Sequence, residues 1–226
     1  NDGEREQLTR LCPESALRRY AGKDLPQAPR VALIANDAIG NFVVATPIGQ
    51  LIRAELAPVE LAFFNGVRCR EFGEATDLFD RFVPAFGSDP RDVFLSAGQD
   101  PPFDLVINLE ISPFAKGLAA VLAGETGQVC GPCIGHGGRA DMPFPDDAQG
   151  RLWADPDWVS PDLTKRHAIL ETGHIAEIFC RAAYLEGTVP RYRLPSADPA
   201  CDLPDVLIAT AASLPEKLYP FESWRN

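Results

Sequence analysis

The sequence has no long apolar run and no excess of positive charge. No stretch approaches the roughly 20 consecutive apolar residues that a membrane-spanning helix needs, so we expect no membrane span. The polar start of the chain shows no signal-peptide pattern either. Asp and Glu outnumber Lys and Arg by 32 to 21, for a formal net charge of −11. Because a nucleic-acid-binding face needs clustered positive charge, this balance argues against nucleic acid as a partner. It does not exclude an anionic small ligand, which one local lysine can hold.

A disulfide framework, internal repeats and low-complexity tracts are also missing. The six cysteines are scattered over 226 residues, and a domain of that size does not need disulfides for stability. We therefore expect a reducing, cytoplasmic compartment. A hydrophobic fraction of 46% with 23% charged residues is typical of a soluble globular protein.

Short apolar runs alternate with segments of helical periodicity along the chain. Runs long enough for a buried strand but too short for a helix occupy 31–35, 59–64, 103–109, 128–134 and 206–210. Helical patterns cover 4–20, 41–55, 67–79, 112–123 and 163–185, whereas 81–86 and 92–99 fit either class. This alternation predicts an α/β fold: a Rossmann-like, mostly parallel sheet with helices on both faces.

The pattern also predicts how the chain divides into domains. Residues 1–29 form a lead-in, and 30–190 form the Rossmann-like domain, including a Gly-, Pro- and Asp-rich excursion over 135–157. A proline-containing linker follows over 191–204. Residues 205–226 then read as the first strand and helix of a second α/β domain, most of which we expect to be missing from this sequence.

The strongest local signal is the stretch from 31 to 55. A buried strand enters a polar loop containing Asn36, Asp37 and Gly40, and the loop opens a helix. In an open α/β sheet, ligands bind beyond the carboxyl ends of the strands. The first N–H groups of the helix attract anions. The same strand–loop–helix pattern is common in α/β proteins that bind nothing there.

Two motifs resemble glycosyltransferase family 9, the ADP-heptose:lipopolysaccharide heptosyltransferase family. The first is Gly40 with Pro47 seven residues later, directly after the opening strand. The second is Lys217-x-x-Pro-x-Glu-x-Trp, which ends at Trp224. Between them, the run Phe-Asp-Leu-Val-Ile-Asn over 103–108 resembles a strand of that family.

The resemblance implies a GT-B architecture, in which two Rossmann-like domains face a cleft. The first domain would bind a glycan or glycolipid acceptor, with Gly40, Asn108 and Glu110 on the acceptor side. The second would bind a nucleotide sugar, its phosphates held by Ser213 and Lys217. The nucleotide sugar is then a substrate, and neither a cofactor nor a metal is implied. Such an enzyme works in the cytoplasm, at the inner membrane surface.

The sequence departs from the family at one important position. The family places an Asp, understood as the general base, directly after the first Gly, but this chain has Asn41. An amide cannot accept a proton at neutral pH, so Asn41 cannot be that base. Asp37 is the nearest substitute in the same loop. The open interpretations are that Asp37 replaces the base, that the acceptor differs, or that the chain is a non-catalytic relative that binds nucleotide sugars or glycans.

Cys130-Gly131-Pro132-Cys133 offers a less favoured alternative, because this tetrapeptide equals the thioredoxin active-site sequence. In thioredoxin it opens a helix that lowers the pKa of the first thiol. Here a Gly-rich loop follows, so a thiol-disulfide oxidoreductase is disfavoured. A metal site with His136 lacks a fourth ligand.

Two tryptophans and two histidines can be explained by structural roles alone. Trp153 and Trp158 either stack on a sugar or pin the long loop. His167 and His174 are expected on one face of the predicted helix 163–185.

Overall fold

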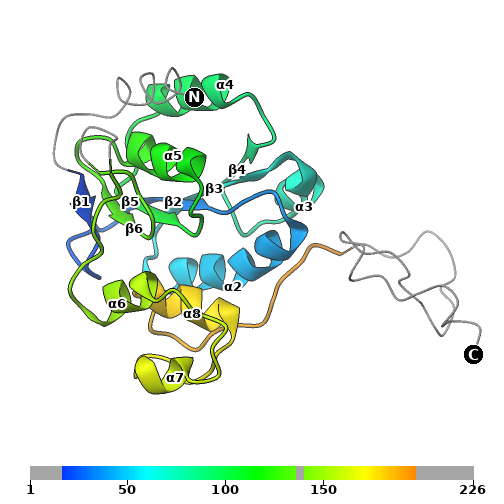
Figure 1. Ribbon diagram of the computed structural model, residues 1–226. Coiled ribbons are helices and arrows are strands. Elements are labelled where there is room, and N and C mark those ends of the chain that lie inside the picture. Colours follow the sequence, from blue (N-terminus) through cyan, green and yellow to red (C-terminus); the bar gives the residue numbers. More distant parts are fainter. Residues whose placement is uncertain (1–16, 136–139, 197–226) are drawn as a thin grey trace, which may run out of the picture. The chain divides into compact units, whose positions relative to one another are not determined.

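The computed structural model describes residues 17–135 and 140–196 (Figure 1). The predicted strand at 206–210, Ser213, Lys217 and His136 lie outside this part of the chain, as does the lead-in up to residue 16. The structure therefore does not test the predictions made for these residues.

The core of the fold is a six-stranded sheet in the order β1-β6-β5-β2-β3-β4. Every neighbouring pair is parallel, which confirms the predicted Rossmann-like α/β class. The strands are β1 (Arg18–Arg19), β2 (Arg30–Ile34), β3 (Glu60–Gly66), β4 (Arg81–Phe86), β5 (Leu105–Asn108) and β6 (Gln128–Cys130). The helix predicted for 4–20 is wrong at its end, because Arg18 and Arg19 pair with β6 as the edge strand β1.

The helices cover both faces of the sheet, as predicted. They are α2 (Ile39–Glu55), η1 (Val67–Cys69), α3 (Arg70–Ala75), α4 (Pro90–Gln99), α5 (Pro113–Ala123), α6 (Ala148–Ala154), α7 (Leu163–Arg166) and α8 (Ile175–Ala182). Figure 1 shows α2 and α8 on one side of the sheet and α4 and α5 on the other. Among the segments left open by the sequence, 81–86 is the strand β4, and 92–99 belongs to α4.

Strand β2 shows why a continuous apolar run predicted a central strand. Val31 and Leu33 enter the core under α2, whereas Ala32 and Ile34 enter the core under α4 and α5. All four side chains are fully buried. Because a parallel strand covered on both faces has no solvent side, its sequence does not alternate between apolar and polar residues.

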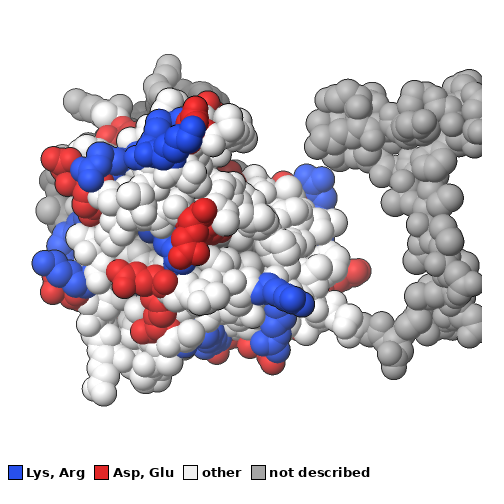
Figure 2. Space-filling model, turned by 90° about the horizontal axis from the view of Figure 1, so that it is seen from below, with Lys and Arg blue, Asp and Glu red and all other residues white. Residues whose placement is uncertain are grey.

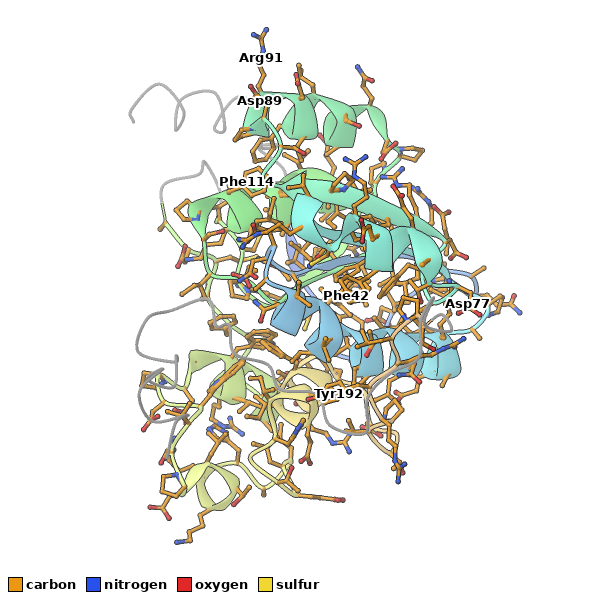
Figure 3. All side chains as sticks on the ribbon, turned by 90° about the vertical axis from the view of Figure 1, so that its right-hand side faces the viewer. Phe42, Asp77, Asp89, Arg91, Phe114 and Tyr192 are labelled. Atoms are coloured by element: carbon orange, nitrogen blue, oxygen red, sulfur yellow. The ribbon has the colours of Figure 1, made fainter. Side chains whose placement is uncertain are left out.

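Aromatic side chains fill the core on the α2 side. Phe42, labelled in Figure 3, lies between α2 and the sheet. Its ring centroid is 5.7 Å from those of Phe63 and Phe72, and 6.4 Å from that of Phe79. Such pairs stabilise a core by about 0.5–1.5 kcal/mol beyond area burial. Phe42 thereby anchors the first turn of α2, which begins right after the loop that follows β2.

Pro47 lies well inside α2 without ending it. A proline lacks the N–H that would bond to the carbonyl four residues earlier, here that of Val43. The hydroxyl of Thr46 donates to this carbonyl instead, at 2.8 Å. The same hydroxyl accepts the N–H of Arg193 at 3.0 Å. Thr46 therefore repairs the helix and fixes the segment that follows α8.

Segment 186–193 lies along α2 and is held by its polar side chains. The carboxylate of Glu55 accepts the N–H of Gly187 at 2.7 Å, and the amide of Gln50 donates to the carbonyl of Arg191 at 2.9 Å. The first residues of the expected linker 191–204 are thus bound to the first domain.

The single helix predicted for 163–185 is wrong. The chain forms α7 and α8 with an irregular turn between them. The carboxylate of Glu177, only 5% exposed, accepts the N–H groups of Glu171 and Thr172 at 2.7 and 2.8 Å and stabilises this turn. His167 and His174 therefore do not share a helical face: His167 ends α7, and His174 caps the start of α8.

Charged side chains of both signs are spread over the face shown in Figure 2, with uncharged surface between them. This face carries no continuous basic field. In the described part of the chain, no helix combines the length and the apolarity that crossing a bilayer requires.

Candidate functional site

The topology singles out the boundary between β2 and β5. From β2 the chain proceeds outward to β3 and β4, and then returns to build β5 and β6 on the opposite side of β2. The loops that leave β2 and β5 consequently diverge at their carboxyl ends. Such a switch point is where open α/β sheets form their ligand-binding crevice.

Glu110 lies at this switch point, just after β5. One of its carboxylate oxygens accepts the backbone N–H of Asn36 at 3.4 Å and the side-chain amide of Asn41 at 3.3 Å. Asn36 follows β2, and Asn41 lies in the first turn of α2. The structure thus brings together Asn41 and Glu110, which are 69 residues apart in the sequence.

Burial raises the pKa of Glu110 above its ordinary value. The bonds from Asn36 and Asn41 act in the opposite direction, while the nearby negative charge of Asp37 adds to the rise. A carboxylate with a raised pKa holds a proton more strongly and is a better general base near neutral pH. Such a group in a ligand crevice is a candidate for catalysis.

Asn108 positions Glu110 and is itself fully buried. Its carbonyl oxygen accepts the backbone N–H of Glu110 at 3.0 Å, and its amide donates to the carbonyls of Glu110 and Pro132 at 2.9 and 2.6 Å. The side chain therefore joins the loops after β5 and β6. An acceptor-side role for Asn108 can only be indirect in this arrangement.

The first turn of α2 is open. Ala38, at the N-cap position, provides no side-chain cap, and the first turn contains no acidic residue. A methyl group at Gly40 would meet no atom within 4 Å. The N–H of Asn41 donates to the carbonyl of Ala38 at 2.9 Å. The N–H groups of the exposed residues Ile39 and Gly40 are therefore the ones that a polar or anionic ligand could bind at this helix start.

Asp37 is paired with Arg68. Its carboxylate accepts from Nε and an Nη of Arg68 at 2.9 and 2.7 Å. Close behind it lies Gly66, where a Cβ would sit 1.9 Å from that of Asp37. The carboxylate of Asp37 thus bonds to Arg68, whereas that of Glu110 bonds to Asn41. Whether Asp37 takes part in catalysis stays a prediction.

The thiol-disulfide alternative does not fit the environment of its cysteines. Cys130 belongs to the core under α2, and Cys133 belongs to the core under α5. The thiol of Cys130 contacts the carbonyl of Ala182 at 3.3 Å, and burial raises its pKa to about 12. A reactive cysteine needs the reverse, an accessible thiol with a lowered pKa. Within residues 17–135 and 140–196, no group of three or more His, Cys, Asp or Glu side chains is placed to hold a metal ion.

An aromatic cleft of about 400 Å³ opens beside the switch point. It begins at Leu109 and Ile111, which flank Glu110, and continues to Trp153 and Trp158. Both indole N–H groups are used internally: Trp153 donates to the carbonyl of Ala182 at 2.9 Å and Trp158 to that of Leu152 at 2.8 Å. The two tryptophans therefore pin the long loop and also line a cavity.

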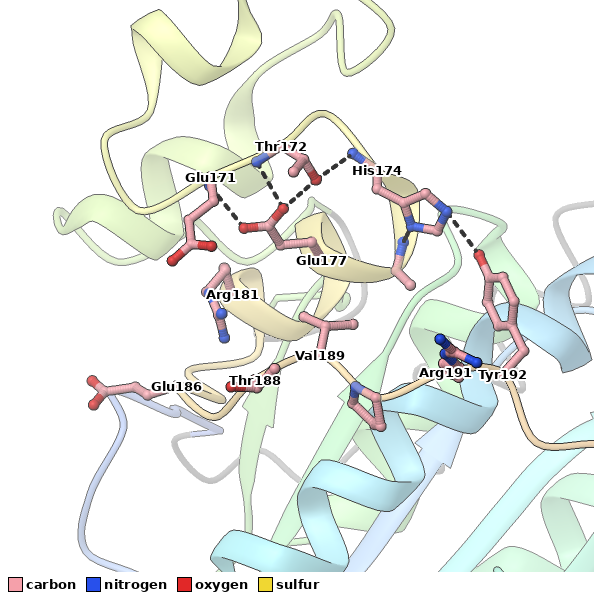
Figure 4. A pocket seen from close by; sticks show the side chains of 12 residues that line it. Glu171, Thr172, His174, Glu177, Arg181, Glu186, Thr188, Val189, Arg191 and Tyr192 are labelled. Carbon is pink, nitrogen blue, oxygen red and sulfur yellow. Dashed lines mark hydrogen bonds between the residues drawn. The ribbon is translucent and has the colours of Figure 1, made fainter.

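A larger cavity of about 760 Å³ lies between α8 and segment 186–193 (Figure 4). It contains none of the residues that the sequence indicated as site residues. The acid Glu177 is saturated by its bonds to the α7–α8 turn, and Arg181 donates to the carbonyls of Leu185 and Gly187. His174 contacts the hydroxyl of Tyr192 at 3.2 Å. Glu177 thus holds the α7–α8 turn, whereas Arg181 and His174 hold the segment that follows α8.

Sequence reasoning identified Glu110 and Asn41 separately but missed how they meet. It also missed Asn36 as a donor to Glu110, and the two phenylalanines, Phe144 and Phe179, that complete the aromatic cleft. Only the position of Asn36 at the carboxyl end of a strand could have signalled its role. A phenylalanine in a loop carries no comparable signal.

Neither a protein-family model nor a curated protein matches the chain. Among solved structures, a glycosyl transferase family 9 protein from Veillonella parvula DSM 2008 is similar over 45% of this chain and 31% of its own, with 14% identity and a TM-score of 0.39. E. coli heptosyltransferase WaaC with ADP is similar over 73% of this chain and 50% of its own, with 14% identity and a TM-score of 0.44. WaaC with ADP-2-deoxy-2-fluoro heptose gives the same coverage, 13% identity and a TM-score of 0.41. The chain thus spans half or less of these proteins. Its own described residues show a Rossmann-like domain with a half-buried carboxylate, that of Glu110, at the switch point.

Proposed function

We propose that this chain is the acceptor-side part of a glycosyltransferase, with Glu110 as the general base. The observation that carries the proposal is a carboxylate of raised pKa at the switch point, held by Asn36 and Asn41. The motif resemblance to family 9 supports the reaction class. The substrates are then a nucleotide sugar and a glycan or glycolipid, and the work is done in the cytoplasm at the inner membrane surface.

The proposed reaction is a single displacement at the anomeric carbon of the donor sugar. The acceptor oxygen forms a bond to that carbon, the bond from the carbon to the diphosphate oxygen breaks, and the nucleoside diphosphate leaves with the electron pair. Glu110 takes the proton of the acceptor hydroxyl. A positioned general base contributes about 10²- to 10⁴-fold to the rate.

Asn41 gains a role in this proposal. Its amide donates to Glu110, so it orients the carboxylate and leaves the second oxygen for a hydroxyl. The amide that could not replace the family's aspartate thereby supports a base supplied by another loop. Ser213 and Lys217 remain the proposed ligands of the donor diphosphate, with a lysine charge and a helix start suited to that leaving group.

The substitution Glu110→Gln tests the base directly. Glutamine keeps the size of the side chain and an oxygen that accepts from Asn41, but it cannot take a proton. In the chain joined to its second domain, we expect kcat for sugar transfer to fall by about 10²-fold or more with little change in acceptor affinity. The exposed Glu125, in the turn after α5, gives the matched control Glu125→Gln.

Carboxyl-detected NMR titration of the 226-residue chain supplies a readout that needs no donor domain. Glu110 should titrate above an ordinary glutamate, and its signal should disappear in Glu110→Gln. Transfer at the wild-type rate by Glu110→Gln would refute the assignment of the base. Donor and acceptor binding without transfer would instead favour the non-catalytic relative.

A further inference from the structure

The aromatic cleft beside Glu110 is built from several elements that are distant in the sequence. Leu109 and Ile111 come from the loop after β5, Lys116 comes from α5, and Trp153 comes from α6. Trp158 closes the cleft from the turn after α6. A volume of about 400 Å³ falls within the usual range for small-molecule sites.

The aromatic side chains form a connected wall. The rings of Phe144 and Trp153 are nearly parallel, 11° apart, with centroids at 6.1 Å. Trp158 lies 5.4 Å from Trp153 and 5.2 Å from Phe179. All four side chains are half-buried. Because both indole N–H groups are bonded to backbone carbonyls, the wall offers ring surface rather than hydrogen-bond donors.

The Trp158 turn is held rigidly. Asp155 accepts from Nε and an Nη of Arg166, each at 3.0 Å, and contacts Nε2 of His167 at 2.7 Å. It also accepts the backbone N–H of Asp157 at 2.9 Å. These bonds use the carboxylate fully, so Asp155 shapes the cleft and does not serve a ligand.

The cleft carries no unbalanced charge among its lining residues. The charged side chains that line it are Lys116, Asp141 and Asp155. Lys116 Nζ lies 2.5 Å from the carboxylate of Asp141, and Asp155 is paired with Arg166. The guanidinium of Arg19 lies over the Phe144 ring, 4.9 Å from its centroid, but it donates to the carbonyls of Gly131, Met142 and Pro143. A phosphate or carboxylate entering the cleft would therefore have to break one of these interactions or remain uncompensated, at a desolvation cost.

We propose that this cleft binds a neutral sugar residue of the acceptor, next to the residue whose hydroxyl reacts. The apolar C–H face of a pyranose suits the ring surface of Trp153 and Trp158, since stacking removes both from water. Its hydroxyls can accept from Lys116 and donate to Asp141. This inference rests on the proposed function, because it gives that function an acceptor class: a glycan with an uncharged unit at this subsite.

The residues on either side of Glu110 support the proposal that the cleft lies next to the base. Leu109 and Ile111 line the cleft, whereas Glu110 between them faces Asn41. A ligand in the cleft would thus contact the two chain neighbours of the base. Ile111, 76% exposed, stands at the rim where a longer glycan would pass.

The test measures sugar binding by the 226-residue chain, using tryptophan fluorescence and saturation-transfer NMR. The probes are methyl glucoside and methyl galactoside, compared with glucuronate and glucose 6-phosphate. The binding energy typical of small ligands predicts a Kd of about 1 mM for the neutral glycosides. We expect the anionic sugars to bind at least about tenfold more weakly.

Two variants with one control localise the effect. Phe144→Leu keeps an apolar side chain but removes ring surface, and should weaken neutral-sugar binding several-fold. Phe86→Leu alters a half-buried ring outside the cleft, paired with Phe114 at 5.2 Å, and should leave sugar binding unchanged. Asp141→Asn leaves Lys116 without its acid, and should raise glucuronate affinity about tenfold. Because Asp141 is 65% exposed, this variant tests the cleft even if Phe144→Leu does not fold.

The outcomes separate this inference from the proposed function. Anionic sugars binding as tightly as neutral ones, or no response at tryptophan, would overturn the neutral-sugar subsite while leaving the Glu110 titration intact. If Glu110→Gln still binds neutral sugars and transfers sugar at the wild-type rate, Glu110 is not the base, but the neutral-sugar subsite is retained.

Discussion

Replacing Gly40 by alanine should stabilise the protein and yet impair its ligand binding. Gly40 is exposed in the first turn of α2, and a Cβ there would meet no atom within 4 Å. The substitution therefore costs nothing sterically in the free protein. Glycine in a helix is less favourable than alanine by about 0.5–1 kcal/mol. For a chain of this size, that gain corresponds to a rise in Tm of about 1–4 °C.

Two other glycines provide matched comparisons. Gly98 in α4 is also exposed with open space around it, so Gly98→Ala should stabilise the protein similarly and leave binding unchanged. At Gly66, a Cβ would lie 1.9 Å from that of Asp37, so Gly66→Ala should destabilise the protein strongly.

The assay combines thermal unfolding by circular dichroism with calorimetric titration of nucleotide sugars and acceptor glycans. If a ligand approaches the open helix start, Gly40→Ala gains stability but loses affinity, whereas Gly98→Ala only gains stability. A lowered Tm for Gly40→Ala would refute the geometry of the open first turn. Unchanged ligand affinity would show that this turn does not contact the ligand.

Four further predictions follow from individual side chains. Burial raises the pKa of Glu110, so the protonated side chain contributes to the free energy of unfolding. This contribution is complete below about pH 4.3, the ordinary glutamate value, and is lost as the pH rises through the pKa of the folded state. In urea unfolding, Glu110→Gln should therefore be more stable than the wild type at neutral pH but not in acid. Cys130, with a pKa raised to about 12, should resist thiol labelling at pH 8 until the protein unfolds, as mapped by mass spectrometry; rapid labelling of the native protein would reopen the redox alternative. Thr46→Val leaves a helix carbonyl without its donor and should cost about 1–3 kcal/mol of unfolding free energy, so an unchanged denaturation midpoint would show that the carbonyl finds another partner. Lys217→Ala should weaken nucleoside-diphosphate binding about tenfold or more, since charge-assisted hydrogen bonds contribute roughly 1.5–3 kcal/mol; equal affinity by calorimetry would remove Lys217 from the donor site.

Local sequence patterns were sufficient for most of the fold. The runs at 31–35, 59–64 and 103–109 became central strands because parallel strands covered on both faces need uninterrupted apolar residues. The helix α5 begins after Ser112, whose hydroxyl accepts the N–H of Ala115, as its capping preference predicts. Helical periodicity wrongly predicted a single helix over 163–185, because the buried acid Glu177 stabilises a turn within this segment. The hydrogen bonds of Glu177 stabilise a turn that helical spacing alone cannot reveal.

The sequence by itself determined the parallel α/β class, the loop after the first strand, and the presence of a carboxylate at the end of another strand. These are consequences of short-range patterns, because strand burial and helix capping depend on neighbouring residues. Only the tertiary structure decided that Glu110 meets Asn41 while Asp37 meets Arg68. It also decided that the four cysteines in the described part of the chain are buried and that four aromatic side chains line one cleft. These contacts join residues far apart in the chain, and their pKa shifts arise from burial, which no local pattern encodes.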